Sequence, residues 1–433
     1  IAGVVCGAAV MCYAEFASMI PVAGSAYTFT YTTVGEIVAW VIGWDLILEM
    51  LMAGSVVSKY WGVYLNQFFE LIGWNINTNI AIGSFNFDLA PVIIVAFFTA
   101  LLVMGTKIGA RVDGALTILK IAIVVFIVVV GFFYIKAENF TPFIPPSEPA
   151  ASTDGSGVSA VMEQPLWQWA TGMAPSIYGV TGIISGAALV FFAFLGFDVV
   201  ATASEETINP KKNVPLGIGV GLGLIIVLYT LVAIVTTGMV SYKDLAKQSD
   251  PSLAVAFKMV GADWAAKIIS LGIVIGMATV VMVLLLGLTR VVFAMSRDGL
   301  LPRGLSHTGK HGTPVRLQII VGVVMALIAA CCNVGILSDM VNIGTLSAFT
   351  LVAISIPIMR KKRPDLERSF KIPGNPWVPI LIAIANLWLM VNLSVLTWIR
   401  FVVWLIVGFA IYFGYGYRHA RLGAGELEVA AQE

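Results

Sequence analysis

Charged residues are scarce in this sequence. Asp, Glu, Lys and Arg make up 11% of its 433 residues, whereas soluble domains typically carry about 25%. Hydrophobic residues make up 59%, the mean hydropathy is +0.94 and the formal net charge is +1. This composition excludes an ordinary water-soluble domain, and the small net charge gives no sign of a nucleic-acid-binding surface. The surface of such a chain is suited to lipid rather than to water.

Motifs for catalysis, for ATP-driven pumping and for metal binding are missing as well. The sequence holds no GxxxxGK[ST] phosphate loop, no nucleophile elbow and no HExxH pair. The three histidines have no carboxylate or thiolate cluster near them in sequence, and the four cysteines lack metal-ligand spacing. We therefore expect neither an enzyme nor a bound metal or other cofactor. We expect buried free thiols at the cysteines, which are Cys6, Cys12, Cys331 and Cys332.

Long apolar runs, in contrast, are abundant. About eleven of them approach the roughly 20 residues that a helix needs to span a bilayer. One run, near 35–66, is too long for an upright span, so we expect a strongly tilted helix or one that extends beyond the bilayer. We predict an all-α integral membrane protein without a soluble domain. The runs lie at roughly 1–20, 35–66, 90–106, 112–135, 180–203, 214–240, 264–294, 316–333, 337–359, 377–396 and 400–416.

Basic residues gather in alternate connections between these runs, most densely at 360–363. The positive-inside rule places this set of connections, and with it the C-terminus, in the cytoplasm. The proline-rich segment 136–178 then lies outside, where Trp167 and Trp169 indicate a short interfacial helix. On this assignment the first run passes from outside to inside. We therefore expect at least one further span upstream and about twelve in all.

One apolar run carries its own interruption. Gly196 and Asp198 lie inside the run that begins near 180, within the stretch FFAFLGFD at 191–198. A membrane helix satisfies its backbone groups internally, so carbonyls freed by a break must face protein or a water-filled cavity. Such cavities are where transporters hold their substrates. We therefore predict a break near Gly196 and a substrate site beside it.

Ionisable residues inside apolar runs are further site candidates, because a charge at membrane depth costs at least about 2.5–3.5 kcal/mol. Lys120 lies about 13 Å along its helix from Arg111. We predict that it couples transport to protons or fills the place of a coupling cation, with snorkelling to the cytoplasmic interface as the alternative. Glu49 shares a helix face with Asp45. It either contacts substrate or relays a proton, or it makes a structural hydrogen bond across the bundle.

Gate residues are suggested on both sides of the break. Phe192 is either ordinary apolar packing or a lid over the site. Glu205 and Glu206 precede Asn209-Pro210-Lys211-Lys212 at a cytoplasmic boundary. They form either a solvated, paired helix end or an inner gate that closes against a cytoplasmic base.

Four stretches resemble cationic amino acid transporters of the amino acid–polyamine–organocation superfamily. The run 191–198 with its continuation 204–210 resembles the sixth helix of these proteins. Residues 12–27, 43–49 and 288–302 are also similar to that family, in the expected order and across nearly the whole chain. The combination is highly specific, whereas the Glu-Glu…Asn-Pro element alone is only suggestive.

The resemblance implies two inverted five-helix repeats plus two extra helices, with substrate held between broken helices one and six. On this resemblance we expect the chain to begin within family helix two, with about eleven of twelve helices visible and without the half of the site that holds the substrate carboxylate. The implied divisions are 1–135 (helices two to five), 136–179 (an extracellular loop), 180–360 (helices six to ten) and 361–433 (the last two helices and the tail).

The resemblance also assigns roles to residues. The carbonyls of Phe192, Ala193 and Leu195 are expected to receive the substrate ammonium, Gly196 to let the backbone turn, and Phe192 to act as the outer lid. Lys120 matches the fifth-helix lysine of proton-coupled relatives.

The pocket for the substrate side chain is expected to be apolar. Residues 282–286, with Leu284 at their centre, offer an apolar wall, and Glu49 is the one candidate partner for a cationic side chain. This wall favours small or neutral side chains.

We therefore expect a permease of the plasma membrane that takes up neutral or small L-amino acids with protons by alternating access. The expected partners are the amino acid, protons and membrane lipid, without nucleic acid; a small accessory subunit is left open. Uptake or exchange of cationic amino acids is the first alternative. More distant alternatives are an ion channel, for which no repeated filter motif is present, and a non-transporting amino acid sensor.

Overall fold

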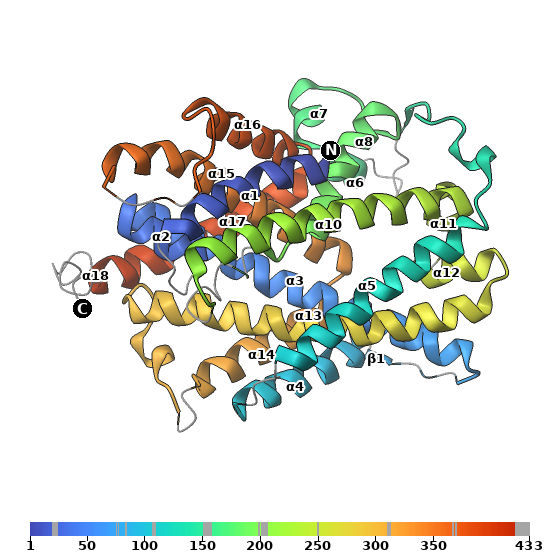
Figure 1. The fold of residues 1–433 in the computed structure, drawn as a ribbon, viewed down its shortest axis with the longest axis horizontal. Coiled ribbons are helices and arrows are strands. Elements are labelled where there is room, and N and C mark those ends of the chain that lie inside the picture. Colours follow the sequence, from blue (N-terminus) through green and yellow to red (C-terminus); the bar gives the residue numbers. More distant parts are fainter. Residues whose placement is uncertain are drawn as a thin grey trace.

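The computed structural model describes the whole chain except residues 20–24, 75, 77, 83–84, 106–109, 150–157, 198–199, 201–206, 249–250, 310–312, 366–367, 369 and 421–433. The described residues form a helical bundle whose long helices run along the longest axis of the molecule (Figure 1). Six helices are long and apolar enough to cross a membrane, and five shorter helices are also apolar. These helices match the eleven apolar runs one by one, which confirms the predicted class.

The helices that correspond to the apolar runs have the following bounds: α1 (Ala2–Met19), α3 (Glu36–Leu71), α4 (Leu89–Val103), α5 (Ala110–Phe132), α8 (Gly179–Val190), α10 (Pro210–Met239), α13 (Asp263–Arg297), α14 (Val315–Cys331), α15 (Val334–Lys362), α16 (Trp377–Val391) and α17 (Val395–Ile411). One helix between α1 and α3 was not predicted, namely α2 (Ser25–Thr33). A 3₁₀ helix, η2 (Phe191–Phe194), follows α8 directly. A π-helical turn, η5 (Tyr412–Gly416), and the short α18 (Tyr417–His419) follow α17.

The two longest helices, α3 and α13, pack closely in the centre of the bundle (Figure 1). Glycines permit this close approach. A Cβ atom at Gly43 of α3 would lie 2.7 Å from the sulfur of Met295 on α13, a separation that real Cβ atoms do not reach. At Gly344 of α15, a Cβ atom would lie 3.1 Å from the side chain of Leu48 on α3. Small residues at these crossings let α3 serve as the axis on which α13 and α15 pack.

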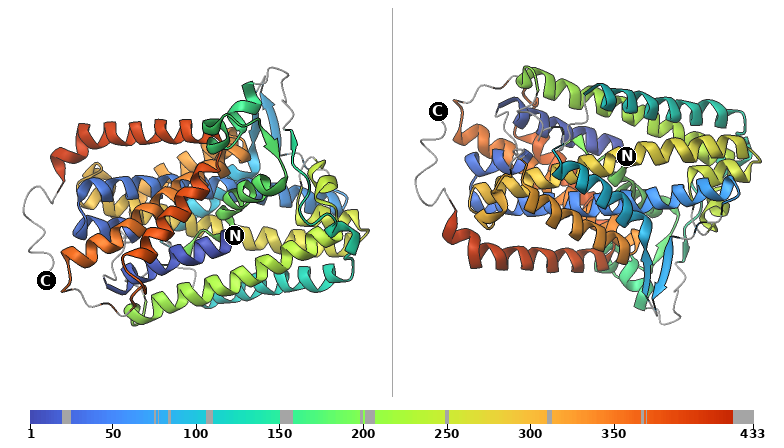
Figure 2. Two further views of the ribbon diagram at one scale, coloured as in Figure 1. Left: turned by 90° about the horizontal axis from the view of Figure 1, so that it is seen from above. Right: turned by 90° about the horizontal axis from the view of Figure 1, so that it is seen from below.

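Apolar side chains cover the outer faces of the bundle. Helices α5 and α10 lie at one edge and α17 at the opposite edge (Figure 2). Phe132 of α5 and Val220 of α10 are exposed by 67% and 65%. Exposed apolar surface of this extent is suited to acyl chains. The cysteines correct one prediction. All four are free, as expected, and Cys6 and Cys12 are buried, but Cys331 is exposed and Cys332 is only partly buried. Cys331 lies on a face of α14 that also exposes Ile320, Val324 and Leu327.

Short elements gather at one end of the bundle, opposite the end that holds α18 (Figure 1). An antiparallel hairpin of β1 (Asn79–Ile82) and β2 (Phe85–Asp88) precedes α4, and the Asp88 side chain caps α4 by accepting from the Ala90 amide at 3.2 Å. Three further short elements are η1 (Ala137–Phe140), α11 (Tyr242–Ala246) and α12 (Leu253–Met259), while η4 (Arg303–Ser306) joins α13 to α14.

The long connection between α5 and α8 is more ordered than an extended loop. It contains β3 (Glu148–Pro149), α6 (Val158–Glu163), α7 (Leu166–Thr171) and β4 (Ser176–Ile177), with β3 paired to β4. Helix α7 is the short helix expected around Trp167 and Trp169. Trp169 is 53% exposed, but the Trp167 indole donates to the side-chain oxygen of Asn392 at 2.8 Å. Trp167 therefore ties the loop to the end of α16, in addition to any interfacial role.

A buried carboxylate holds the opposite end of the bundle together. Glu15 of α1 is fully buried, and its Oε1 accepts from Nε of Arg360 on α15 at 2.7 Å. Its Oε2 also accepts from the backbone amide of Ile372, at 2.8 Å, in the connection between α15 and α16. Nε of Arg368 lies 3.8 Å from the same carboxylate. Glu15 thus links α1, α15 and the following connection through charge-assisted hydrogen bonds.

The substitution Glu15→Gln should destabilise the protein by about 3 kcal/mol or more, because it leaves the charge of Arg360 without its buried partner. The free energy of unfolding in mixed detergent micelles measures the effect. Glu70→Gln is the matched control, because Glu70 pairs with Lys258 at an exposed site, where such a pair contributes about 0–1 kcal/mol. Equal stability losses in the two variants would contradict the central place of Glu15.

Candidate functional site

The predicted interruption is present. Helix α8 ends at Val190, the chain continues as the 3₁₀ turn η2, and Leu195 is extended with φ −66° and ψ 154°. Gly196 then has φ +114°, a conformation that side-chain-bearing residues rarely adopt. The break therefore lies where the sequence placed it. Asp198, which also marked the run, lies outside the described residues.

Neighbouring elements cover some of the carbonyls that the break frees. The Asn342 side chain of α15 donates to the Leu189 carbonyl at 2.9 Å. The Cys6 thiol of α1 lies 3.9 Å from the Phe194 carbonyl, and the Leu195 amide donates to the Phe192 carbonyl at 3.2 Å. Of the three carbonyls expected to bind an ammonium, that of Phe192 is thus already engaged within the chain, with one lone pair left. Asn342 was not predicted, although an Asn inside an apolar run is itself a signal.

Aromatic side chains support the break from one side. Phe191 and Phe197 are buried, and their ring centres lie 5.8 Å and 5.0 Å from that of Phe349 on α15. The Tyr13 ring of α1 lies 5.3 Å from that of Phe197. Edge-to-face and tilted aromatic pairs of this kind add to the apolar area that they bury. The cluster fixes the chain on both sides of the extended Leu195.

The other side of the break is open. Ala193 is exposed, and a Cβ atom added to Gly196 would meet no described atom within 4 Å. A short segment of non-helical backbone therefore borders space that none of the described residues fills. In a membrane protein, such backbone is stable where it faces a water-filled cavity or a polar ligand.

Three predicted site residues meet in one apolar cluster. Phe192 and Leu195, at the break, pack against a buried cluster that includes Leu284 of α13. Ala53 of α3 and Val341 of α15 belong to the same cluster. We call this set, with its partly buried neighbours, the apolar wall. The structure thus brings the break and the predicted side-chain pocket together from three different helices.

Glu49 lies one helical turn before Ala53 on α3 and is 2% exposed. Asp45, a further turn before it, is fully buried. The structure therefore places the Glu49 carboxylate next to the apolar wall along α3, but not within it. Its contact with a substrate remains a prediction.

Lys120 of α5 packs against α13. Its side chain runs along Gly276 of α13, where an added Cβ atom would lie 3.3 Å from Cγ and 3.8 Å from Cε of the lysine. Gly276 lies one turn before Val280, which borders the apolar wall, and eight residues, about 12 Å along the helix, before Leu284. The structure therefore places the stem of Lys120 at the contact between α5 and α13. Glu205 and Glu206, the predicted inner gate, lie outside the described residues.

Comparison with known proteins settles the family. A family model described as amino acid permease matches residues 1–414. The chain belongs to the amino acid permease family. It is therefore a multi-pass membrane transporter rather than an enzyme, as the composition and the resemblance predicted.

Three similar relatives illustrate the range of the family. The branched-chain amino acid permease BcaP of Bacillus subtilis (strain 168) is 41% identical over 432 residues, which cover 98% of this chain and 85% of the relative. The methylthioribose transporter of the same organism is 40% identical over 430 residues, 98% of this chain and 86% of the relative. The vacuolar cationic amino acid transporter 2 of Arabidopsis thaliana is 36% identical over 372 residues, 84% of this chain and 54% of the relative. The permease is thus more similar to these two bacterial transporters than to this cationic transporter.

Replacing Gly196 should destabilise the permease through the backbone alone. We expect Gly196→Ala to cost about 1–3 kcal/mol, because alanine must adopt a strained φ although its methyl group has free space. Gly219→Ala is the control: Gly219 lies within α10, its added Cβ meets nothing within 4 Å, and it has no positive φ. That variant should be neutral or slightly more stable. Matching unfolding curves for the two variants would argue against the strained conformation at Gly196.

Proposed function

We propose that this permease takes up neutral L-amino acids with apolar side chains, including branched ones, together with protons. The apolar wall beside the break is the observation that carries this proposal. It combines Phe192 and Leu195 at the break with Leu284 of α13, Ala53 of α3 and Val341 of α15. Burial of a leucine or valine side chain on such a surface contributes about 1.5–3 kcal/mol.

A cationic side chain fits this wall less well. A guanidinium or ammonium group needs a partner when it leaves water, and Glu49 is a full turn removed from Ala53. The relatives point the same way: permeases named for branched-chain amino acids in Bacillus subtilis and Lactococcus lactis are 41% and 30% identical to this chain. Cationic amino acid uptake is therefore the second candidate, with Glu49 as its one supporting residue.

The substrate ammonium would be held by backbone. In the proposed complex the carbonyls of Ala193 and Leu195 accept from the ammonium, with the remaining lone pair of the Phe192 carbonyl as a third acceptor. Gly196 turns the chain so that these groups face the open side of the break. Phe192 closes over the bound substrate, and alternating access proceeds around this interrupted segment. Glu205 and Glu206 would form the inner gate.

The orientation in the membrane follows from charge. The basic group Arg360-Lys361-Lys362-Arg363 ends α15 on the side of α18, so we place this end of the bundle, with the C-terminus, in the cytoplasm of a cell bounded by its plasma membrane. We propose the two inverted repeats that the resemblance implies, and residues 180–360 form the second of them. The proposal assigns no small accessory subunit.

Purified permease in liposomes tests the proposal. Labelled leucine should accumulate when the lumen is made alkaline relative to the outside. Competition by the twenty amino acids and by methylthioribose should be strongest for isoleucine, leucine and valine. Liposomes without protein are the background.

A substitution in the apolar wall tests whether this wall selects the substrate side chain. Leu284→Ala removes the α13 side chain from the wall and should weaken leucine uptake about tenfold through lost apolar contact, while alanine uptake changes little. Strongest competition by arginine and lysine in the parent protein would refute the neutral preference. Uptake driven by sodium but not by the pH gradient would refute proton coupling.

Lys120 is proposed to carry the coupling proton. A lysine held between α5 and α13 can lose its proton when the surroundings exclude water, and can regain it when they open. Lys120→Ala should remove the stimulation of leucine uptake by the pH gradient, but should weaken leucine binding less than about threefold.

Lys120→Arg separates two roles. Arginine keeps the charge but does not release its proton in this pH range. A variant that still binds leucine yet shows no pH-gradient stimulation supports a proton carrier. Lys258→Ala, at an exposed pair with Glu70, is the control. Full stimulation in Lys120→Ala would remove Lys120 from the mechanism.

A further inference from the structure

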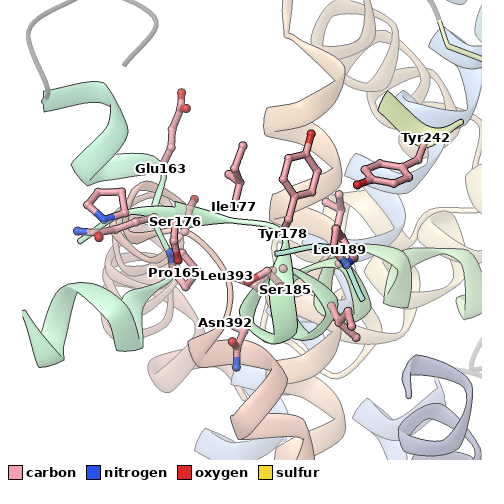
Figure 3. A pocket seen from close by; sticks show the side chains of 18 of the residues that line it. Glu163, Pro165, Ser176, Ile177, Tyr178, Ser185, Leu189, Tyr242, Asn392 and Leu393 are labelled. Atoms are coloured by element: carbon pink, nitrogen blue, oxygen red, sulfur yellow. The ribbon is translucent and has the colours of Figure 1, made fainter. Parts of the chain in front are cut away.

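A cavity of about 900 Å³ lies at the end of the bundle where the short elements gather. Its walls come from the connection between α5 and α8, from α8 itself, from the first turns of α15 and from the link between α16 and α17. Figure 3 shows side chains from these segments around it, including Ser176, Tyr178, Ser185 and Asn392. With the proposed orientation, the cavity is on the extracellular side of the break.

The charge of this cavity has one sign. Its described lining contains two charged residues, Glu163 and Asp339, both carboxylates, and no lysine, arginine or histidine. Two cations lie near the cavity without belonging to its described lining. Lys243 donates to Glu148 at 2.9 Å, and that contact raises the pKa of Lys243, so the lysine stays charged and paired. Arg400 of α17 acts on Asp339 by charge and offsets part of the negative charge of that carboxylate. A cavity with carboxylates and no cationic partner among its described lining attracts positive charge.

Neighbouring segments hold the Asp339 carboxylate and the backbone next to Glu163. Asp339 Oδ2 accepts from the Thr397 hydroxyl at 3.0 Å, and a carboxylate has further acceptor capacity for a ligand. The backbone that follows Glu163 is fixed by two hydrogen bonds to the link before α17: Leu166 donates to Leu393 at 3.0 Å, and Val395 donates to Gln164 at 3.1 Å. Asp339 is thus prepositioned, which lowers the entropy cost of binding, while the exposed Glu163 side chain can turn toward a ligand.

Aromatic and apolar groups complete the cavity. Tyr178 and Tyr242 line it with ring centres 5.5 Å apart, and the Lys243 ammonium already lies 5.2 Å from the centre of the Tyr178 ring. The Tyr178 ring therefore already makes a cation–π contact in this structure. Phe140, Ile183 and Leu189 supply apolar surface. An ammonium on a short apolar skeleton matches this combination better than an anion or a sugar.

The cavity leads toward the break. Leu189 lines it, and Phe192 follows Leu189 by three positions, about 4.5 Å of helical rise. The Leu189 carbonyl is the one that Asn342 covers. A ligand at the inner end of the cavity would therefore be within one turn of the lid over the proposed central site.

We propose that this cavity is an outer binding site for a primary ammonium group on a small apolar skeleton, with Glu163 and Asp339 as its acceptors. The inference that a transported amino acid binds in this cavity before it reaches the central site rests on the proposed function. The inference that the cavity binds an ammonium group depends only on the residues that line the cavity.

Isoamylamine, which is leucine without its carboxylate, is the probe. The proposed central site also accepts an ammonium with an apolar chain, so the variants at Glu163 and Asp339, which line only the cavity, assign the binding of the amine to one site or the other. Saturation-transfer NMR on the full chain in detergent micelles measures its affinity, with 4-methylpentanoate as the matched acid. The parent protein should bind the amine and not the acid. The double variant Glu163→Gln, Asp339→Asn should bind the amine about three- to tenfold more weakly. In liposomes it should raise the KM for leucine uptake with Vmax unchanged.

Two controls keep the test decisive. Asp244→Asn removes an exposed carboxylate that pairs with Lys247 and is not part of the lining; it should leave amine affinity unchanged. Glu163→Gln alone changes an exposed side chain and should show part of the effect even if the double variant unfolds.

The possible outcomes separate the two proposals. Equal amine affinity in parent and Glu163→Gln, equal binding of the acid, or a lower Vmax at constant KM would overturn the outer site. Amine binding without leucine uptake by the parent would support the outer site and refute the proposed function.

Discussion

The need to satisfy backbone polar groups inside a bilayer governs the centre of this permease. A continuous helix satisfies its own backbone groups, whereas the segment after Val190 does not. Side chains from other helices satisfy some of them instead: Asn342 donates to the Leu189 carbonyl, and the Cys6 thiol lies next to the Phe194 carbonyl. These partners come from α15 and α1, so the broken segment is stable only within the assembled bundle. The open side at Gly196 is where a ligand can supply the remaining contacts.

The rest of the bundle keeps those partners in place. Helix α1 carries Cys6 near the break and Glu15 at the far end, where the Glu15 carboxylate binds Arg360 of α15. Helix α15 carries Asn342, Phe349 and Arg360 along its length. The two helices that support the break are thus also joined to each other by a buried ion pair. Movement of one relative to the other would alter the covering of both carbonyls, so the alternating access that we propose at the break would be coupled to this contact.

Much of the architecture could be predicted from sequence, and the failures have a common cause. Apolar runs fixed the eleven helices because lipid imposes length and composition together. Gly196 marked the break because glycine alone tolerates its φ without strain. The role of Asn342, the exposure of Cys331 and the meeting of Leu284 with Phe192 depend on how helices face one another. Helix α2 and the hairpin β1–β2 lie in short connections, where no long periodic pattern exists. Glu205 and Glu206 lie outside the described residues, so their predicted role stands as it was.

In the proposed mechanism, the position of Lys120 bears on how protons would be coupled to transport. The aliphatic stem of the lysine packs at Gly276, about 12 Å along α13 from Leu284. Coupling would then pass through the packing of α5 on α13. Gly276 leaves room for the aliphatic stem of the lysine, and a shift between these helices would change how much water reaches its amine. A proton on Lys120 would thus favour one relative position of α5 and α13, and that position would set the affinity at the break.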